Sequence, residues 1–285
     1  MRVALATCAL AVAAAQDPAN GWIAYAVGEV PEGKGRITAL EMTWKVSDDP
    51  ARGNAFFSPW FGMDPSDNLN LIQPVNPWGG SSWSMYTEYF QWSPEHNSNS
   101  PQTPVSAGQT LHGALTCVVK VHAAPRNDTN QHSHCDFTPA CALPCCAPRR
   151  YHPLLDGYTL NQTVVETGRS SHQFVKCQSG KNYTLPYIVY EKVFPCGQYP
   201  PDGKVDFTIV KAECDNVNCI DDLAWKPMVQ ESHCDFKANI VSNTEISITW
   251  DTQMKSKYDD YTPAQLHDLN YHGWAAKLDI PRPQE

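Results

Sequence analysis

Alternation of apolar and polar residues, broken at short intervals by proline, glycine and asparagine, runs through this chain from residue 21 to about residue 250. Residues 37–46 show it most clearly, and residues 111–121, 205–209 and 246–250 repeat it. A period of two belongs to strands with one buried face. Because no amphipathic helix lies between these runs, they predict an antiparallel β-sandwich or β-barrel.

The first fifteen residues predict a secretory leader. They carry Arg2 and then an apolar run that ends in small residues, MRVALATCALAVAAA. Such a segment is a signal peptide, cut here after Ala15, and it is too short to cross a bilayer. No later segment is apolar over a long enough stretch to span one. We therefore expect a secreted, extracellular protein that begins near Gln16 and does not bind membranes.

Length and charge set the broad class of the chain. With 285 residues it can form one large β domain or two small ones. It carries 30 acidic and 21 basic residues, and loss of Arg2 with the leader leaves 20 basic residues and a net charge near −10. That excess of acid argues against a nucleic-acid partner.

Cysteine count and glycosylation sequons both point to export. Eleven cysteines become ten when Cys8 leaves with the leader, and an even number suits complete disulfide pairing. Sequons at Asn127, Asn161 and Asn182 permit N-glycosylation in a eukaryotic host. The cysteines predicted to pair are Cys117, Cys135, Cys141, Cys145, Cys146, Cys177, Cys196, Cys214, Cys219 and Cys234.

Residues 123–153 form an insertion rich in cysteine and proline. This composition does not suit a regular strand or helix, so we expect disulfides to hold the insertion in place of a core. His132 and His134 stand close to four of the cysteines, and His and Cys at short spacing can also bind zinc. An oxidising compartment favours disulfides. We therefore expect no metal site.

The C-terminal tail, residues 251–285, contains one predicted helix. Thr262 is the expected N-cap, Pro263 the first helical residue, and Gln265 completes a capping box. Gly273 is expected to end the helix. We expect the helix to pack against the β domain.

Residues 57–94 are rich in aromatic side chains. Residues two apart in a strand share a face. One face of the run 86–92 then consists of Tyr86, Glu88, Phe90 and Trp92, and the other of Thr87, Tyr89 and Gln91. The rings are either core packing, which is the commoner role of aromatic residues, or the floor of a cleft that holds Asp64 and Gln73 beside a polar substrate.

Four short motifs between residues 60 and 109 resemble those of the glutamic endopeptidases (eqolisins), secreted acid peptidases of fungi. They occur in the family's order and at similar spacing. The motifs are Trp60-Phe61-Gly62-Met63-Asp64, Leu71-Ile72-Gln73, the run YTEYFQWSP from Tyr86 to Pro94, and Val105-Ser106-Ala107-Gly108-Gln109. Weaker similarity covers most of residues 20–250.

The resemblance implies an all-β, concanavalin-like antiparallel sandwich of two curved sheets, which we assign to residues 16–250. It also implies a secreted, acid-acting endopeptidase, a hydrolase in which a glutamine and a glutamate act on an activated water. A carboxamide can face a developing oxyanion without repelling a nearby acid, and a carboxylate can take a proton from water. We expect a polypeptide substrate, no cofactor and a monomer.

Matching the motifs residue by residue gives the candidate site. Gln73 falls at the catalytic glutamine, and we assign the catalytic glutamate to Glu191. Gln91 stands where the family carries a supporting acid, and Glu88, on the opposite strand face, is not a clean replacement. The residues expected to bind substrate are Trp60, Asp64, Tyr86, Glu88, Gln91, Trp92 and Tyr187.

The strand that carries the catalytic glutamate in the family departs from the pattern here. The nearest match is LPYIVYE, residues 185–191, and two alignments put Tyr187 or Pro186 at the catalytic position. Neither is an acid. Glu191 shares a strand face with Tyr187 but lies about 13 Å further along, at ~3.3 Å per residue. A bulge or a register shift would have to bring it to Gln73.

An inactive relative is the alternative. Such a binding module would keep the aromatic groove and use it for a peptide or a glycan. Nine tryptophans and twelve tyrosines suit either function, because peptides and sugars both stack on rings. The distance from the Gln73 amide to the nearest carboxylate across the groove distinguishes the two.

Overall fold

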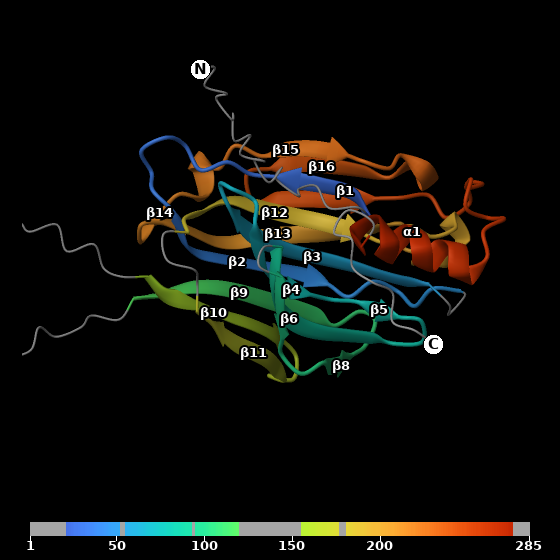
Figure 1. Ribbon diagram of the computed structural model, residues 1–285, viewed down its shortest axis with the longest axis horizontal. Helices are drawn as coiled ribbons and strands as arrows, with labels where there is room; N and C mark the ends of the chain where they lie inside the picture. Colours follow the sequence, from blue (N-terminus) through green and yellow to red (C-terminus); the bar gives the residue numbers. More distant parts are fainter. Residues whose placement is uncertain (1–20, 52–54, 93–94, 120–154, 177–180, 276–285) are drawn as a thin grey trace, which may run out of the picture.

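The computed structural model describes residues 21–51, 55–92, 95–119, 155–176 and 181–275. Two β-sheets stack face to face as layers, and helix α1 (Pro263–Ala275) lies at the end of the sandwich shown on the right in Figure 1. Every strand pairing is antiparallel. The predicted antiparallel β-sandwich is thus confirmed.

The first sheet has the strand order β15-β1-β12-β3-β4-β6-β5, with β7 and β8 also paired to β6. It carries the candidate site. Its strands are β1 (Trp22–Val27), β3 (Phe56–Pro65), β4 (Asn70–Val75), β5 (Trp78–Gly79), β6 (Trp83–Trp92), β7 (Glu95–Asn99), β8 (Thr103–Val105), β12 (Tyr183–Glu191) and β15 (Lys226–Val229).

The second sheet has the order β11-β10-β9-β2-β13-β17-β16, with β14 paired to β13. Its strands are β2 (Ile37–Lys45), β9 (Thr110–Val119), β10 (Leu155–Val164), β11 (Ser170–Val175), β13 (Lys204–Cys214), β14 (Val217–Asn218), β16 (Lys237–Ser242) and β17 (Glu245–Thr249). The described part of the chain also contains three short 3-10 helices: η1 (Cys196–Gln198), η2 (Ile220–Asp222) and η3 (His233–Asp235).

Strand alternation builds the core between the sheets. Leu40, Met42 and Trp44 of β2 are buried, and Trp44 stacks on Phe207 of β13 with ring centroids 5.4 Å apart. On β6 the alternation is equally regular, because residues 83, 85, 87, 89 and 91 are buried in the core and residues 84, 86, 88 and 90 face outward, half-buried. The inward face of β6 is thus core packing, and its outward face carries half-buried side chains.

Among the described residues, two disulfides stabilise the loops beside the sandwich. Cys196 of η1 bonds Cys234 of η3, and Cys214 at the end of β13 bonds Cys219. Cys117 is half-buried and forms no disulfide with another described cysteine. The other predicted partners lie outside the described residues: Cys135, Cys141, Cys145, Cys146 and Cys177.

Helix α1 begins as the sequence predicts. The Thr262 backbone N–H donates to Gln265 Oε1 at 2.8 Å, and the Gln265 N–H donates to Thr262 Oγ1 at 3.3 Å, which is a capping box. Leu266 is buried against the sandwich. The predicted end is wrong, because the helix passes Gly273 and reaches Ala275. Glycine lowers helix propensity but keeps its backbone N–H, so it does not by itself stop a helix.

Several sequence expectations fall outside the described residues. The leader, the 123–153 insertion and Asn127 are among them. Asn161 lies half-buried on β10, and Asn182 is exposed just before β12. None of the helices described here has the length and apolar character needed to cross a membrane.

Candidate functional site

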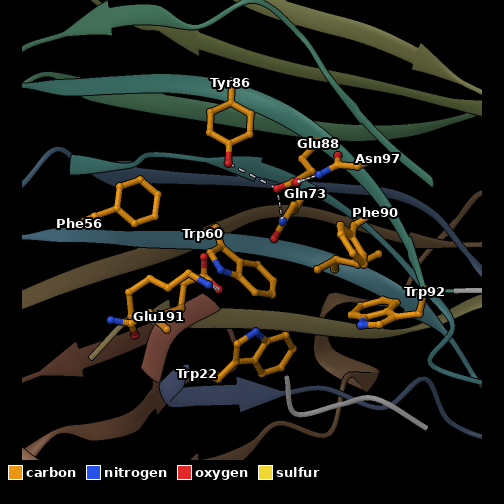
Figure 2. Close-up of a pocket in the computed structure, with 13 residues that line it drawn as sticks. Trp22, Phe56, Trp60, Gln73, Tyr86, Glu88, Phe90, Trp92, Asn97 and Glu191 are labelled. Carbon is orange, nitrogen blue, oxygen red and sulfur yellow. Dashed lines mark hydrogen bonds and ion pairs between the residues drawn. The ribbon is translucent and has the colours of Figure 1, made fainter. Parts of the chain in front are cut away.

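A groove of about 310 Å³ opens on the outer face of the first sheet. Figure 2 shows it as a ring of aromatic side chains around a small polar centre. The residues that line it are Trp22, Phe56, Trp60, Leu71, Gln73, Tyr86, Glu88, Phe90, Trp92, Asn97, Glu191, Lys192 and Asn270.

Gln73 and Glu88 form the polar centre of the groove. They stand directly opposite each other on the neighbouring strands β4 and β6. Gln73 Nε2 donates a hydrogen bond to Glu88 Oε2 at 2.7 Å (Figure 2). A carboxylate is thus in direct contact with the amide of Gln73, the residue that the resemblance matches to the catalytic glutamine. Strand β6, which carries Glu88, is adjacent to β4 on the side away from β12.

Two further donors hold the Glu88 carboxyl in place. Asn97 of β7 donates through Nδ2 to Oε1 at 2.9 Å, and the Tyr86 hydroxyl lies 3.4 Å from Oε2. Burial raises the pKa of Glu88 above its ordinary 4.5, and the nearby negative charge of Glu191 adds to that rise. The hydrogen bonds from Asn97 and Gln73 act in the opposite direction. Loss of solvent is the largest effect, so Glu88 holds its proton to a higher pH than an exposed glutamate.

Strand register places Tyr187 level with Gln73. Gly62 of β3 pairs with Tyr187 of β12, and the β3–β4 pairing of Met63 with Ile72 puts Gly62 beside Gln73. Tyr187 is buried and packs edge-on against Trp22, with ring centroids 5.2 Å apart. The strand position that the resemblance gives to the catalytic glutamate therefore holds an aromatic ring.

Gly62 allows β3 and β4 to approach closely at this point. A Cβ atom on residue 62 would lie 2.6 Å from the Ile72 carbonyl oxygen and 3.0 Å from the Gln73 Cβ. Both are shorter than normal contacts. A larger residue at position 62 would push β4 away and displace the Gln73 amide.

Glu191 also lines the groove, but at the end of β12. It pairs with Ser58 of β3, and the pairing of β12 with β3 is regular from Leu185 to Glu191. Register shifts occur near the start of β12, between Tyr183 and Leu185, and on β1, between Trp22 and Ala24, but none interrupts the β12–β3 pairing between Tyr187 and Glu191. Figure 2 shows Glu191 on the other side of Trp60 from Glu88. The catalytic role of Glu191 stays a prediction.

The remaining predicted site residues divide between the groove and the core. Trp60, Tyr86 and Trp92 line the groove. Gln91 does not, because it lies on the core face of β6, where its Oε1 accepts a 2.6 Å hydrogen bond from the Tyr89 hydroxyl. Asp64 is completely buried. Neither side chain can touch a ligand in this conformation.

Sequence reasoning missed the parts of the site that come from distant elements. Asn97 from β7 and Asn270 from α1 line the groove without belonging to a matched motif, and Trp22 from β1 lies in the region of weaker similarity. Strand alternation did place Phe90 on the groove face with Glu88. Nothing in the local sequence around Asn97 or Asn270 shows that these side chains line the same groove as Gln73.

No family model and no curated protein matches this chain. Solved structures do. Two crystal structures of scytalido-glutamic peptidase, with a peptide-based transition-state analogue and with a transition-state analogue inhibitor, match at 14% and 15% identity. Each match has a TM-score of 0.52 and covers 81% of this chain and 98% of the other. SCP-B, an eqolisin in complex with the tripeptide Ala-Ile-His, matches at 14% identity with a TM-score of 0.49 over the same shares of the two chains.

This likeness defines the class of fold. The chain is a β-sandwich of the kind seen in glutamic peptidases. At such low identity the likeness shows a shared fold, so the chemistry has to come from the groove of this chain.

Proposed function

We propose that this chain is a peptidase that hydrolyses unfolded polypeptides at mildly acidic pH, with Gln73 and Glu88 as its reacting pair. The 2.7 Å contact between the Gln73 amide and the Glu88 carboxylate supports this proposal most strongly. The surrounding rings of Trp60, Phe90 and Trp92 offer an apolar surface for the side chains of a peptide. A peptidase of similar fold, whose structure holds a peptide-based transition-state analogue, agrees with a polypeptide ligand.

The two groups have complementary roles in hydrolysis. Ionised Glu88 takes a proton from a water molecule, whose oxygen then bonds to the carbonyl carbon of the substrate. A Gln73 N–H donates to the oxyanion that forms, since an amide nitrogen carries two hydrogens and Glu88 uses one of them. The carbon–nitrogen bond then breaks as protonated Glu88 gives its proton to the leaving amine. The products are one new carboxyl group and one new amino group.

The raised pKa of Glu88 sets the acid side of the pH profile. A general base acts in its ionised form, so kcat/KM should fall as pH drops through the pKa of Glu88. Because burial raises that pKa, the fall should begin above the 4.5 of an ordinary glutamate. We therefore expect activity to rise from strongly acid to mildly acid pH.

Incubation with a denatured protein from strongly acid to neutral pH tests the proposal. We expect cleavage that is indifferent to metal chelators and to serine- and cysteine-directed reagents, because a carboxamide and a carboxylate do the chemistry. Gln73→Ala should lower the rate by about a hundredfold or more, the usual effect of losing an oxyanion donor. A folded protein without hydrolysis at any of these pH values would contradict the proposal.

A peptide-binding module without hydrolysis is the second candidate. This candidate is favoured by Tyr187, whose buried ring occupies the strand position where the resemblance expects an acid. A module of this kind would bind peptides in the groove and release them intact. Secretion and N-glycosylation are part of either proposal and rest on the leader and the sequons.

A further inference from the structure

Lys192 adopts a backbone conformation that directs its side chain into the groove. In a regular strand, adjacent residues face opposite ways, so the residue after Glu191 would point toward the core. Lys192 has a φ of +79°, in the left-handed region that non-glycine residues seldom adopt. The outcome is that Glu191 and Lys192 both line the groove.

The surroundings hold Lys192 in this strained conformation. Its backbone N–H donates to the Gly21 carbonyl at 2.7 Å, and its carbonyl accepts from the Tyr199 hydroxyl at 3.0 Å. The next residue, Val193, exchanges two hydrogen bonds with the Asn270 side chain of α1. Strain that is fixed from several sides is a common feature of binding sites.

The Lys192 ammonium lies where α1 bounds the groove. A Cβ atom on Gly21 would be 3.8 Å from both Lys192 Nζ and Asn270 Oδ1, so the start of β1, the lysine and the helix meet there. Among the described residues that line the groove, Lys192 is the one cation. Its Nζ is 3.6 Å from Glu191 Oε2, and an ammonium carries three N–H donors.

We propose that Lys192 binds the C-terminal carboxylate of the peptide, so that the groove favours cleavage a short, fixed distance from a chain end. This inference rests on the proposed function. Tyr187 is level with Gln73. Lys192 is five residues further along the chain, which corresponds to about 16 Å of strand. An extended peptide of roughly three to five residues fits between the anchor and the reacting pair.

Paired peptides test the anchor independently of hydrolysis. The probes are two peptides of one sequence, with a free or an amidated C-terminus, titrated into the Glu88→Gln variant while tryptophan fluorescence is followed. We expect the free acid to bind about tenfold more tightly or better, the size of one charge-assisted hydrogen bond. Equal affinities would overturn the inference.

Three variants at position 192 separate the charge from the fold. Lys192→Gly accepts the left-handed backbone and removes the ammonium, and Lys192→Met keeps the apolar stem. Both should lose the preference for the free acid, whereas Lys192→Arg should keep it. The Lys192→Gly variant should retain the melting temperature of the parent, because glycine adopts this φ without strain. A preference that survives in Lys192→Gly would contradict the inference.

Product lengths from the wild-type protein distinguish this inference from the proposed function. On a long peptide with a free C-terminus, we expect C-terminal fragments of roughly three to five residues, and much slower cleavage of the amidated peptide. Cleavage at internal bonds without regard to the chain end would support the proposed function and contradict the role of Lys192 as an anchor. Binding that prefers the free acid, without any cleavage, would keep the anchor and contradict the proposed function.

Discussion

Glu88→Gln should lower hydrolysis of a denatured protein by about a thousandfold, within the range expected for loss of a general base. The amide keeps the shape of the carboxyl and can still accept a hydrogen bond from Asn97 or Gln73, but it cannot take a proton from water. The measurement is kcat/KM near the pH optimum, with the melting temperature of each variant to show that it folds.

Glu191→Gln is the matched control for this substitution. Both residues line the groove, but the hydrogen bond from the Gln73 amide goes to Glu88. We therefore expect less than about a tenfold loss from Glu191→Gln, a change too small for a general base. Abolished activity in Glu191→Gln with an active Glu88→Gln would restore Glu191 as the catalytic acid and contradict our proposal.

Stability provides a second readout for Glu88. Because the pKa of Glu88 is raised in the folded state, folding favours protonated Glu88. The resulting contribution to the stability of the protein is complete below the pKa of the unfolded state, near 4.5. That contribution is lost as pH rises through the folded pKa. Glu88→Gln, which stays neutral, should therefore gain stability relative to the parent between acid and neutral pH. A loss of activity in this variant could then not be attributed to unfolding.

Removing the disulfide between Cys196 and Cys234 should lower the free energy of unfolding by about 4 kcal/mol. The bond closes a loop of 38 residues and joins η1 to η3. Its loss gives the unfolded chain much more freedom. The measurement is denaturant unfolding of the Cys196→Ala, Cys234→Ala double variant.

The second disulfide is the matched control. Cys214 and Cys219 are 5 residues apart, so the same relation predicts a loss of about 2 kcal/mol when both become alanine. Equal losses from the two pairs, or a larger loss from the short loop, would contradict an effect that acts through the unfolded chain.

Local pattern was enough to predict most of the sandwich. A strand buried on one face alternates residue by residue, so the pattern of residues 37–46 and 86–92 shows directly in β2 and β6. The start of α1 was predictable for a similar reason, because Thr262, Pro263 and Gln265 act on one another within a single turn.

The site was predictable only in part, because strand pairing joins segments far apart in the chain. Gln73 and the three rings of Trp60, Tyr86 and Trp92 lie in the groove as expected. The role of Glu88 depends on its register with Gln73, which the hairpin of β4 and β6 sets. Strand alternation placed Glu88 on the same face as the groove rings, but no local signal showed which carboxylate would reach the Gln73 amide.

A double-mutant cycle over Gln73→Ala, Glu88→Gln and their combination tests the reacting pair most directly. Residues that act as one unit in a reaction show non-additive losses. We predict that the double variant hydrolyses a denatured protein about as slowly as Glu88→Gln alone, because the oxyanion donor has little to act on once no group deprotonates water. Losses that multiply, or a Glu88→Gln variant with the rate of the wild-type protein, would contradict the assignment of Gln73 and Glu88 as a catalytic pair.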